Sequence, residues 1–118
     1  MGRTLKPHLT VEISNLQDAK EWFQVLQTTD RSQTAVMVLT AGKNSSEEMN
    51  VHKKSDQVLL LVEGELHAEV GGKKRIMKKG DSCIVAAGTP HRFKNLGKKS
   101  AVSFNVYTPP ECPANANG

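Results

Sequence analysis

The sequence is poor in aromatic residues, in cysteine and in long apolar runs. Its 118 residues include one Trp, one Tyr, three Phe and two Cys. A core must therefore be built mainly from aliphatic side chains and Met. Apolar runs such as residues 58–62 are far shorter than the ~20 residues of a membrane span, and the N-terminal MGRTLKPHLT lacks the apolar stretch of a signal peptide. These absences predict a cytoplasmic protein with no membrane segment.

The two cysteines, Cys83 and Cys112, are widely spaced and predict two free thiols rather than a disulfide. The net charge is +4, and the excess Lys and Arg stand in short clusters beside turn signals, such as KKR at residues 73–75. A nucleic-acid surface would interleave such charges with aromatic residues, and none lies near these clusters. We therefore expect no nucleic-acid partner.

The pattern of apolar residues divides the chain into three parts. VEI at residues 11–13 indicates a short strand, and SNLQDAKEWFQVLQ places Leu16, Ala19, Trp22, Phe23 and Leu26 at helical spacing, which predicts a short helix or a turn. From residue 31 to residue 108, short β-branched runs alternate with turn signals, which is typical of a sandwich or barrel. We expect residues 1–30 to pack on this barrel and residues 109–118 to form a Pro-rich, partly disordered tail.

One predicted strand, VLLLV at residues 58–62, is apolar on both faces. Val58 and Leu60 point to one side, and Leu59 and Leu61 point to the other. One face must line the barrel interior. The other needs the N-terminal segment, a helix or a second subunit, and we expect a homodimer.

Two polar segments contain the histidines that are candidates for a site. In MNVHKKSDQ, Asn50 and His52 share a face, and Gln57 begins the apolar strand that follows. In GDSCIVAAGTPHRFKN, His91 and Phe93 lie on one face of another strand. Two such strands can converge at the mouth of a barrel, where their side chains would meet.

These segments resemble the two motifs of the cupins. The first, G-x-x-x-x-x-H-x-H-x-x-x-x-E-x-x-x-x-x-x-G, aligns with Asn50, His52, Gln57 and Gly64 at its last four fixed positions. The second, G-x-x-x-x-x-P-x-G-x-x-H-x-x-x-N, aligns with Gly80, Ala86, Gly88, His91 and Asn95. FQVLQTTDRSQTAVMVL, the spacing H-x-x-x-D-Q and VYTPPE are similar to small bacterial cupins named after phosphomannose isomerase. The resemblance implies an all-β, single cupin jelly-roll barrel.

The resemblance also implies a divalent metal, such as Mn, Fe, Ni or Zn, at the positions of Asn50, His52, Gln57 and His91. Amides stand here where the family has His and Glu, so the four side chains offer the metal no negative charge, and amide oxygens are weak donors. We therefore expect the metal to be weakly held or absent, unless Glu48 supplies a carboxylate.

Glu48, Phe93 and Phe104 are candidate ligand-binding residues, with core packing as the alternative for both phenylalanines. Three functions remain open because fold does not fix function. The first is a small-molecule-binding protein with a weak or absent metal. The second is a metal-dependent oxygenase or sugar-type isomerase, in which the metal acts as a Lewis acid or binds dioxygen. The third is a structural or interaction protein with a vestigial pocket. No glycine-rich phosphate loop is visible, so phosphomannose isomerase activity is not predicted.

Overall fold

The computed structural model describes residues 11–113, which fold into eight strands and one 3-10 turn. The elements are, in chain order, η2 (Leu16–Asp18), β1 (Phe23–Thr28), β2 (Gln33–Leu39), β3 (Asp56–Glu63), β4 (Glu65–Val70), β5 (Lys73–Lys78), β6 (Ser82–Val85), β7 (His91–Lys94) and β8 (Ala101–Thr108). The all-β prediction is thus confirmed. Within the described part of the chain, no helix is long and apolar enough to cross a membrane.

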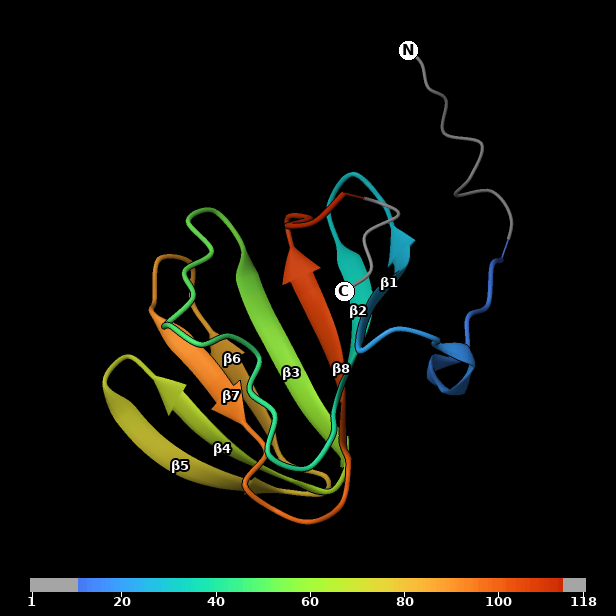
Figure 1. The fold of residues 1–118 in the computed structure, drawn as a ribbon. Coiled ribbons are helices and arrows are strands. Elements are labelled where there is room, and N and C mark those ends of the chain that lie inside the picture. The colour runs from blue at the N-terminus through green and yellow to red at the C-terminus, as the bar shows by residue number, and fades with distance from the viewer. Residues whose placement is uncertain (1–10, 114–118) are drawn as a thin grey trace.

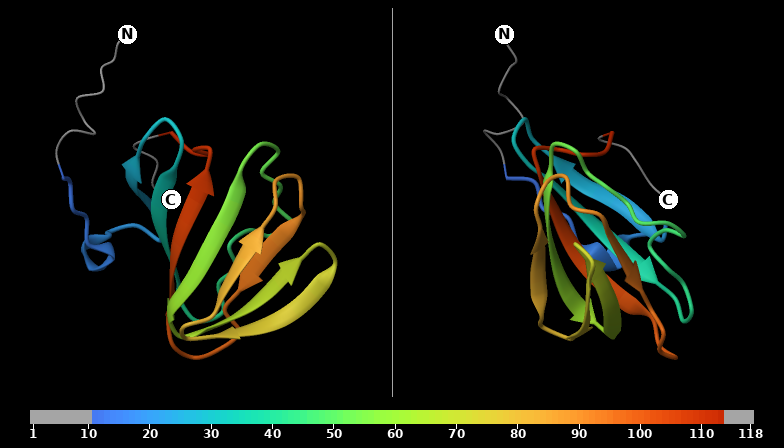
Figure 2. Two further views of the ribbon diagram at one scale, coloured as in Figure 1. Left: turned by 180° about the vertical axis from the view of Figure 1, so that it is seen from behind. Right: turned by 90° about the vertical axis from the view of Figure 1, so that its left-hand side faces the viewer.

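The strands form two antiparallel sheets that face each other (Figures 1 and 2). The larger sheet has the order β1-β2-β8-β3-β6, and the smaller has the order β5-β4-β7. The chain passes from the larger to the smaller sheet at Gly64, which has a φ of +83°. A Cβ there would lie 2.7 Å from the carbonyl oxygen of Ser100, so this tight crossing requires glycine.

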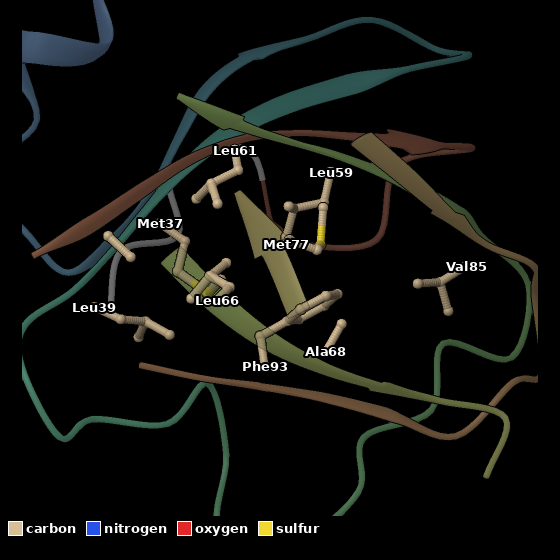
Figure 3. Close-up of a cluster of buried hydrophobic side chains, with 10 residues drawn as sticks. Met37, Leu39, Leu59, Leu61, Leu66, Ala68, Met77, Val85 and Phe93 are labelled. Carbon is tan, nitrogen blue, oxygen red and sulfur yellow. The ribbon is translucent and has the colours of Figure 1, made fainter. Parts of the chain in front are cut away.

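The core fills the space between the two sheets (Figure 3). The β3 side chains Leu59 and Leu61 are fully buried there and face Leu66 of β4, Met77 of β5 and Phe93 of β7. The core is aliphatic with two methionines and one phenylalanine, as the scarcity of aromatic residues predicts. These core side chains come from alternate positions of the strands, because every second residue of a strand points inward.

The other face of β3 remains exposed in the monomer. Val58 and Leu60 alternate with the core residues, and Leu60 is 40% exposed. Ile84 of β6, the register partner of Val58, is 65% exposed. We call this apolar surface, formed by Val58, Leu60 and Ile84, the outer face. No segment among residues 11–113 covers the outer face, although the sequence pattern predicted that the N-terminal segment, a helix or a second subunit would cover it.

The N-terminal segment differs from the sequence-based expectation. Residues 11–13 form no strand, and both Val11 and Ile13 are exposed. Among residues 11–30, only η2 is helical, and the Asn15 side chain caps it by accepting from the N–H of Gln17. The expected short helix or turn is therefore a single turn, and no longer helix runs through Phe23. Phe23 instead starts strand β1, because pairing with β2 satisfies its backbone groups and partly buries its side chain. Residues 1–10 lie outside the described part.

Two further expectations concern irregular segments. MNVH, residues 49–52, is not a strand, because only Asn50 makes an isolated bridge to His91. In the predicted tail, residues 109–113 are described and have no regular structure, whereas residues 114–118 lie outside the described residues.

Candidate functional site

Two histidines from distant parts of the chain come together between the sheets. His52 lies in the loop between β2 and β3, and His91 starts β7. Backbone hydrogen bonds pin that loop to β7: the N–H of Asn50 donates to the carbonyl of His91 at 2.7 Å, and the N–H of His91 donates back at 2.8 Å. The two imidazole centroids therefore lie 4.7 Å apart.

Each imidazole uses its Nδ1 atom to bind a neighbouring acceptor. His52 Nδ1 lies 3.2 Å from a carboxylate oxygen of Glu111, and His91 Nδ1 lies 2.9 Å from the carbonyl oxygen of Thr89. Both partners can only accept, so Nδ1 carries the proton in each ring, and Nε2 is left as an acceptor in the neutral form. Burial lowers the pKa of His91, an effect that the Thr89 carbonyl opposes and His52 reinforces. His91 is therefore a neutral acceptor at neutral pH.

Gln57 is held by a chain of buried polar side chains. Its Nε2 donates to Asn105 Oδ1 at 2.9 Å, and Asn105 Nδ2 donates to Ser103 Oγ at 3.1 Å. All three side chains lie on the inner face of the larger sheet, since they alternate with outward residues on β3 and β8. Gln57 is only 4% exposed, and its Oε1 has no hydrogen-bond partner. A buried acceptor without a partner is costly, which makes Gln57 a candidate for contacting a ligand.

Residues 109–113 run beside the histidine pair and are called the C-terminal strap below. Buried Gln33 at the start of β2 binds the strap through both ends of its amide. Its Oε1 accepts from the N–H groups of Glu111 and Cys112 at 3.1 and 2.9 Å, and its Nε2 donates to the Cys112 carbonyl at 2.7 Å. Ser55 Oγ also donates to the carbonyl of Pro109 at 2.7 Å. These bonds bring Glu111 to His52.

A cavity of about 200 Å³ lies among these groups. Four aromatic side chains form much of its wall: Trp22, Phe23, Phe93 and Tyr107. The remaining lining residues are Met37, Ser45, Asn50, His52, Gln57, His91 and Cys112. No Lys or Arg among the described residues 11–113 belongs to this lining. The cavity is therefore aromatic, uncharged in its direct lining, and polar at the histidine pair.

The cavity brings together most of the side chains that the motifs singled out. Asn50, His52, Gln57, His91 and Phe93 line it. Their assignment to a site stays a prediction, because the geometry shows proximity rather than binding.

Two candidates lie elsewhere. Glu48 is exposed and does not line the cavity, so it does not supply the missing carboxylate. Phe104 pairs in register with Leu60 and points with it to the outer face of the sheet, because Ser103 and Asn105 on either side point inward.

Sequence reasoning missed the residues of the strap and part of the aromatic wall. Glu111 and Cys112 reach the site through contacts with Gln33 that span 78 and 79 positions of sequence, and no local pattern indicates such contacts. Alternation could have found Tyr107, since it lies two residues beyond inward-facing Asn105 on β8. Trp22 was assigned to a helix instead.

The donor set does not fit a tightly held divalent metal. Histidines that bind metals usually donate their second N–H to a carboxylate or a carbonyl, and His52 and His91 do so. However, no group of three or more His, Cys, Asp or Glu side chains among residues 11–113 could hold a metal ion. Gln57 can add only a neutral amide oxygen, and Glu111 contacts the far nitrogen of His52.

Comparison with known proteins gives the family context. Residues 35–107 match the family described as Cupin domain. Over 59 residues the chain is 29% identical to the quercetin 2,3-dioxygenase of Bacillus subtilis (strain 168), and this segment covers 50% of the chain but only 18% of that enzyme. The chain thus spans less than a fifth of this curated relative.

Two solved structures share the fold. The BH2720 protein of Bacillus halodurans superposes with a TM-score of 0.80 at 21% identity, covering 86% of this chain and 80% of that one. A predicted oxalate decarboxylase of Thermotoga maritima superposes with a TM-score of 0.68 at 20% identity, covering 75% of this chain and 79% of that one. At this level of identity the similarity shows the fold alone.

Proposed function

Because this chain belongs to the cupin family, we propose that it binds a small molecule in the cavity between its two sheets. His52 and His91 accept hydrogen bonds from the ligand through Nε2, and Gln57 contributes its unpartnered Oε1. The aromatic wall supplies apolar contact. Such a cavity, apolar with a few convergent polar groups, is typical of small-molecule sites.

The observation that supports this proposal is the fixed orientation of the two imidazoles. Glu111 and Thr89 hold the Nδ1 protons of His52 and His91, so both rings present the same acceptor atom. Packing and hydrogen bonds that hold side chains in place before binding reduce the entropy lost when the ligand arrives. A vestigial pocket would have no need of two imidazoles whose Nδ1 atoms are both held by neighbouring acceptors.

A divalent metal has a secondary place in this proposal. Two imidazoles and a neutral amide oxygen hold a metal weakly, with water completing its coordination. Elemental analysis of protein purified without an affinity tag should therefore find metal well below one equivalent. One equivalent of metal that is lost in both His52→Ala and His91→Ala would refute this expectation and support a metal-dependent oxygenase or sugar-type isomerase.

A thermal-shift screen of small polar and aromatic compounds tests ligand binding directly. We expect compounds that raise the melting temperature of the wild-type protein, with the rise reduced in His52→Ala and His91→Ala. His67→Ala is the matched control, because His67 lies on β4 and does not line the cavity, and its Nε2 lies 3.6 Å from a carboxylate oxygen of Glu65. A screen without any stabilising compound would favour the structural or interaction protein with a vestigial pocket.

A further inference from the structure

The chain concentrates its few aromatic residues around one cavity. It has one Trp, one Tyr and three Phe, and all of them except Phe104 line the cavity that contains the histidine pair. The aliphatic core does not require this arrangement, because Phe93 alone among the five belongs to the buried core cluster. An aromatic wall favours a flat ligand, since offset and edge-to-face ring contacts contribute beyond buried area.

The polar groups of the cavity are chiefly acceptors. Because Nδ1 faces Glu111 in His52 and Thr89 in His91, the neutral form of each ring presents its Nε2 lone pair to the cavity. Gln57 is fixed by Asn105 so that its Oε1, rather than its Nε2, is left without a partner. Each hydroxyl donor of a ligand pairs with one of these three atoms, whereas a ligand that offers only acceptors leaves all three unpaired.

The charges around the cavity disfavour an anion. The chain has 16 Lys and Arg residues, and none of those among residues 11–113 lines the cavity. A negative charge does lie close by, because a carboxylate oxygen of Glu111 is 3.2 Å from His52 Nδ1. Phosphorylated sugars and small carboxylic acids would need a cationic partner in such a partly buried place. An uncharged ligand avoids this cost.

The size of the cavity limits the ligand to about one ring. Its volume is about 200 Å³, and an engineered apolar cavity of about 150 Å³ is enough to hold benzene. A ring with one or two hydroxyl groups fills the space, whereas a fused polycyclic compound would have to extend into solvent.

Three features of the described cavity carry the inference: its aromatic wall, its three convergent acceptors and a lining without Lys or Arg. From them we infer that the ligand is an uncharged, single-ring aromatic compound with one or two hydroxyl groups. The inference rests on the proposed small-molecule function and names the class of molecule that the cavity accepts. Each hydroxyl group donates to one of the three acceptors, on His52, His91 or Gln57, and the ring lies against the aromatic wall.

Calorimetric titration of the full chain with matched probes tests the inference. The probes are phenol and resorcinol, with toluene as a ring without donors, benzoate as an anionic ring, and mannose and mannose 6-phosphate as sugars. We expect resorcinol to bind at least about tenfold more tightly than toluene or benzoate, and the sugars to bind more weakly still. Trp22 is the only tryptophan and lines the cavity, so its fluorescence should change on binding of the phenols.

The variants separate this cavity from other sites. His52→Gln and His91→Gln should weaken resorcinol binding about tenfold and leave toluene binding almost unchanged, whereas His67→Ala should alter neither. The comparison among probes on the wild-type protein remains decisive if a variant does not fold.

The two proposals fail in different ways. Tight binding of benzoate or of either sugar, with a change in Trp22 fluorescence, would overturn the phenolic class and leave the small-molecule function standing. Equal affinity for toluene and resorcinol would overturn the role of the acceptors. Absence of binding by every probe would overturn the phenolic inference, and a negative broad screen besides would overturn the proposed function.

Discussion

Replacing Gln33 with methionine should release the C-terminal strap from the barrel. Gln33 is 1% exposed and makes three hydrogen bonds to the backbone of Glu111 and Cys112, plus one to Thr28. Each such bond contributes a net ~0.5–1.5 kcal/mol, which sets a ceiling of about 4.5 kcal/mol for the three that hold the strap. Because the freed backbone groups regain water when the strap detaches, we expect a loss of about 2 kcal/mol in the free energy of unfolding.

Urea denaturation measures this loss, and hydrogen exchange at the amides of Glu111 and Cys112 reports detachment of the strap. Methionine matches glutamine in length, so the side chain still fills its space. Gln27→Met is the control, because Gln27 makes one exposed bond, to Glu12, and should change stability by less than about 0.5 kcal/mol. If Gln33→Met unfolds at the wild-type urea concentration and both amides stay protected, the strap is held by other contacts and the reasoning is wrong.

Three further predictions concern the glycine crossing, the outer face and the histidine pair. Gly64→Ala and Gly72→Ala each force alanine to a positive φ, which costs about 1–3 kcal/mol of stability. Gly64→Ala should lower the midpoint of urea denaturation further than Gly72→Ala, because only the Cβ at position 64 meets the Ser100 carbonyl. Equal midpoints for the two variants would contradict this prediction. We propose that a second copy of the chain covers the outer face. Analytical ultracentrifugation should therefore find a dimer, and Leu60→Glu should convert it to monomers. A monomeric wild-type protein would refute the proposed dimer. Because burial lowers the pKa of His91, the folded state resists protonation. Unfolding free energy should therefore fall as the pH drops below about 6.5, and His91→Gln should flatten this dependence in urea titrations at a series of pH values.

The parts of the fold that follow from short-range patterns were predictable from the sequence. Alternation placed Leu59 and Leu61 on one face of a strand, and they are core residues. The motif spacing placed His52, Gln57 and His91 in one region, and they line one cavity. In each case the signal extends over a few residues, because a strand repeats every two residues and a motif fixes its own register.

The remaining features depend on competition between distant segments. Trp22 and Phe23 belong to a set of residues at helical spacing, yet Phe23 starts a strand. Pairing with β2 satisfies the backbone hydrogen-bonding groups of Phe23 and at the same time partly buries its side chain. Glu48 is near the motif in sequence but lies in an exposed part of its loop. Glu48, the candidate for an added carboxylate, does not line the cavity, whereas Glu111 lies beside His52 Nδ1 because Gln33 binds the strap.

The central place of β8 in the larger sheet determines when the protein can fold during synthesis. In the order β1-β2-β8-β3-β6, strand β8 separates β2 from β3, so neither can complete its hydrogen-bonding until residues 101–108 have been made. Formation of the sheet must wait for pairings between residues far apart in sequence, which is typical of slow-folding topologies. A nascent chain that ends before β8 exposes two unpaired strand edges, and it would depend on chaperones until the ribosome has added that strand.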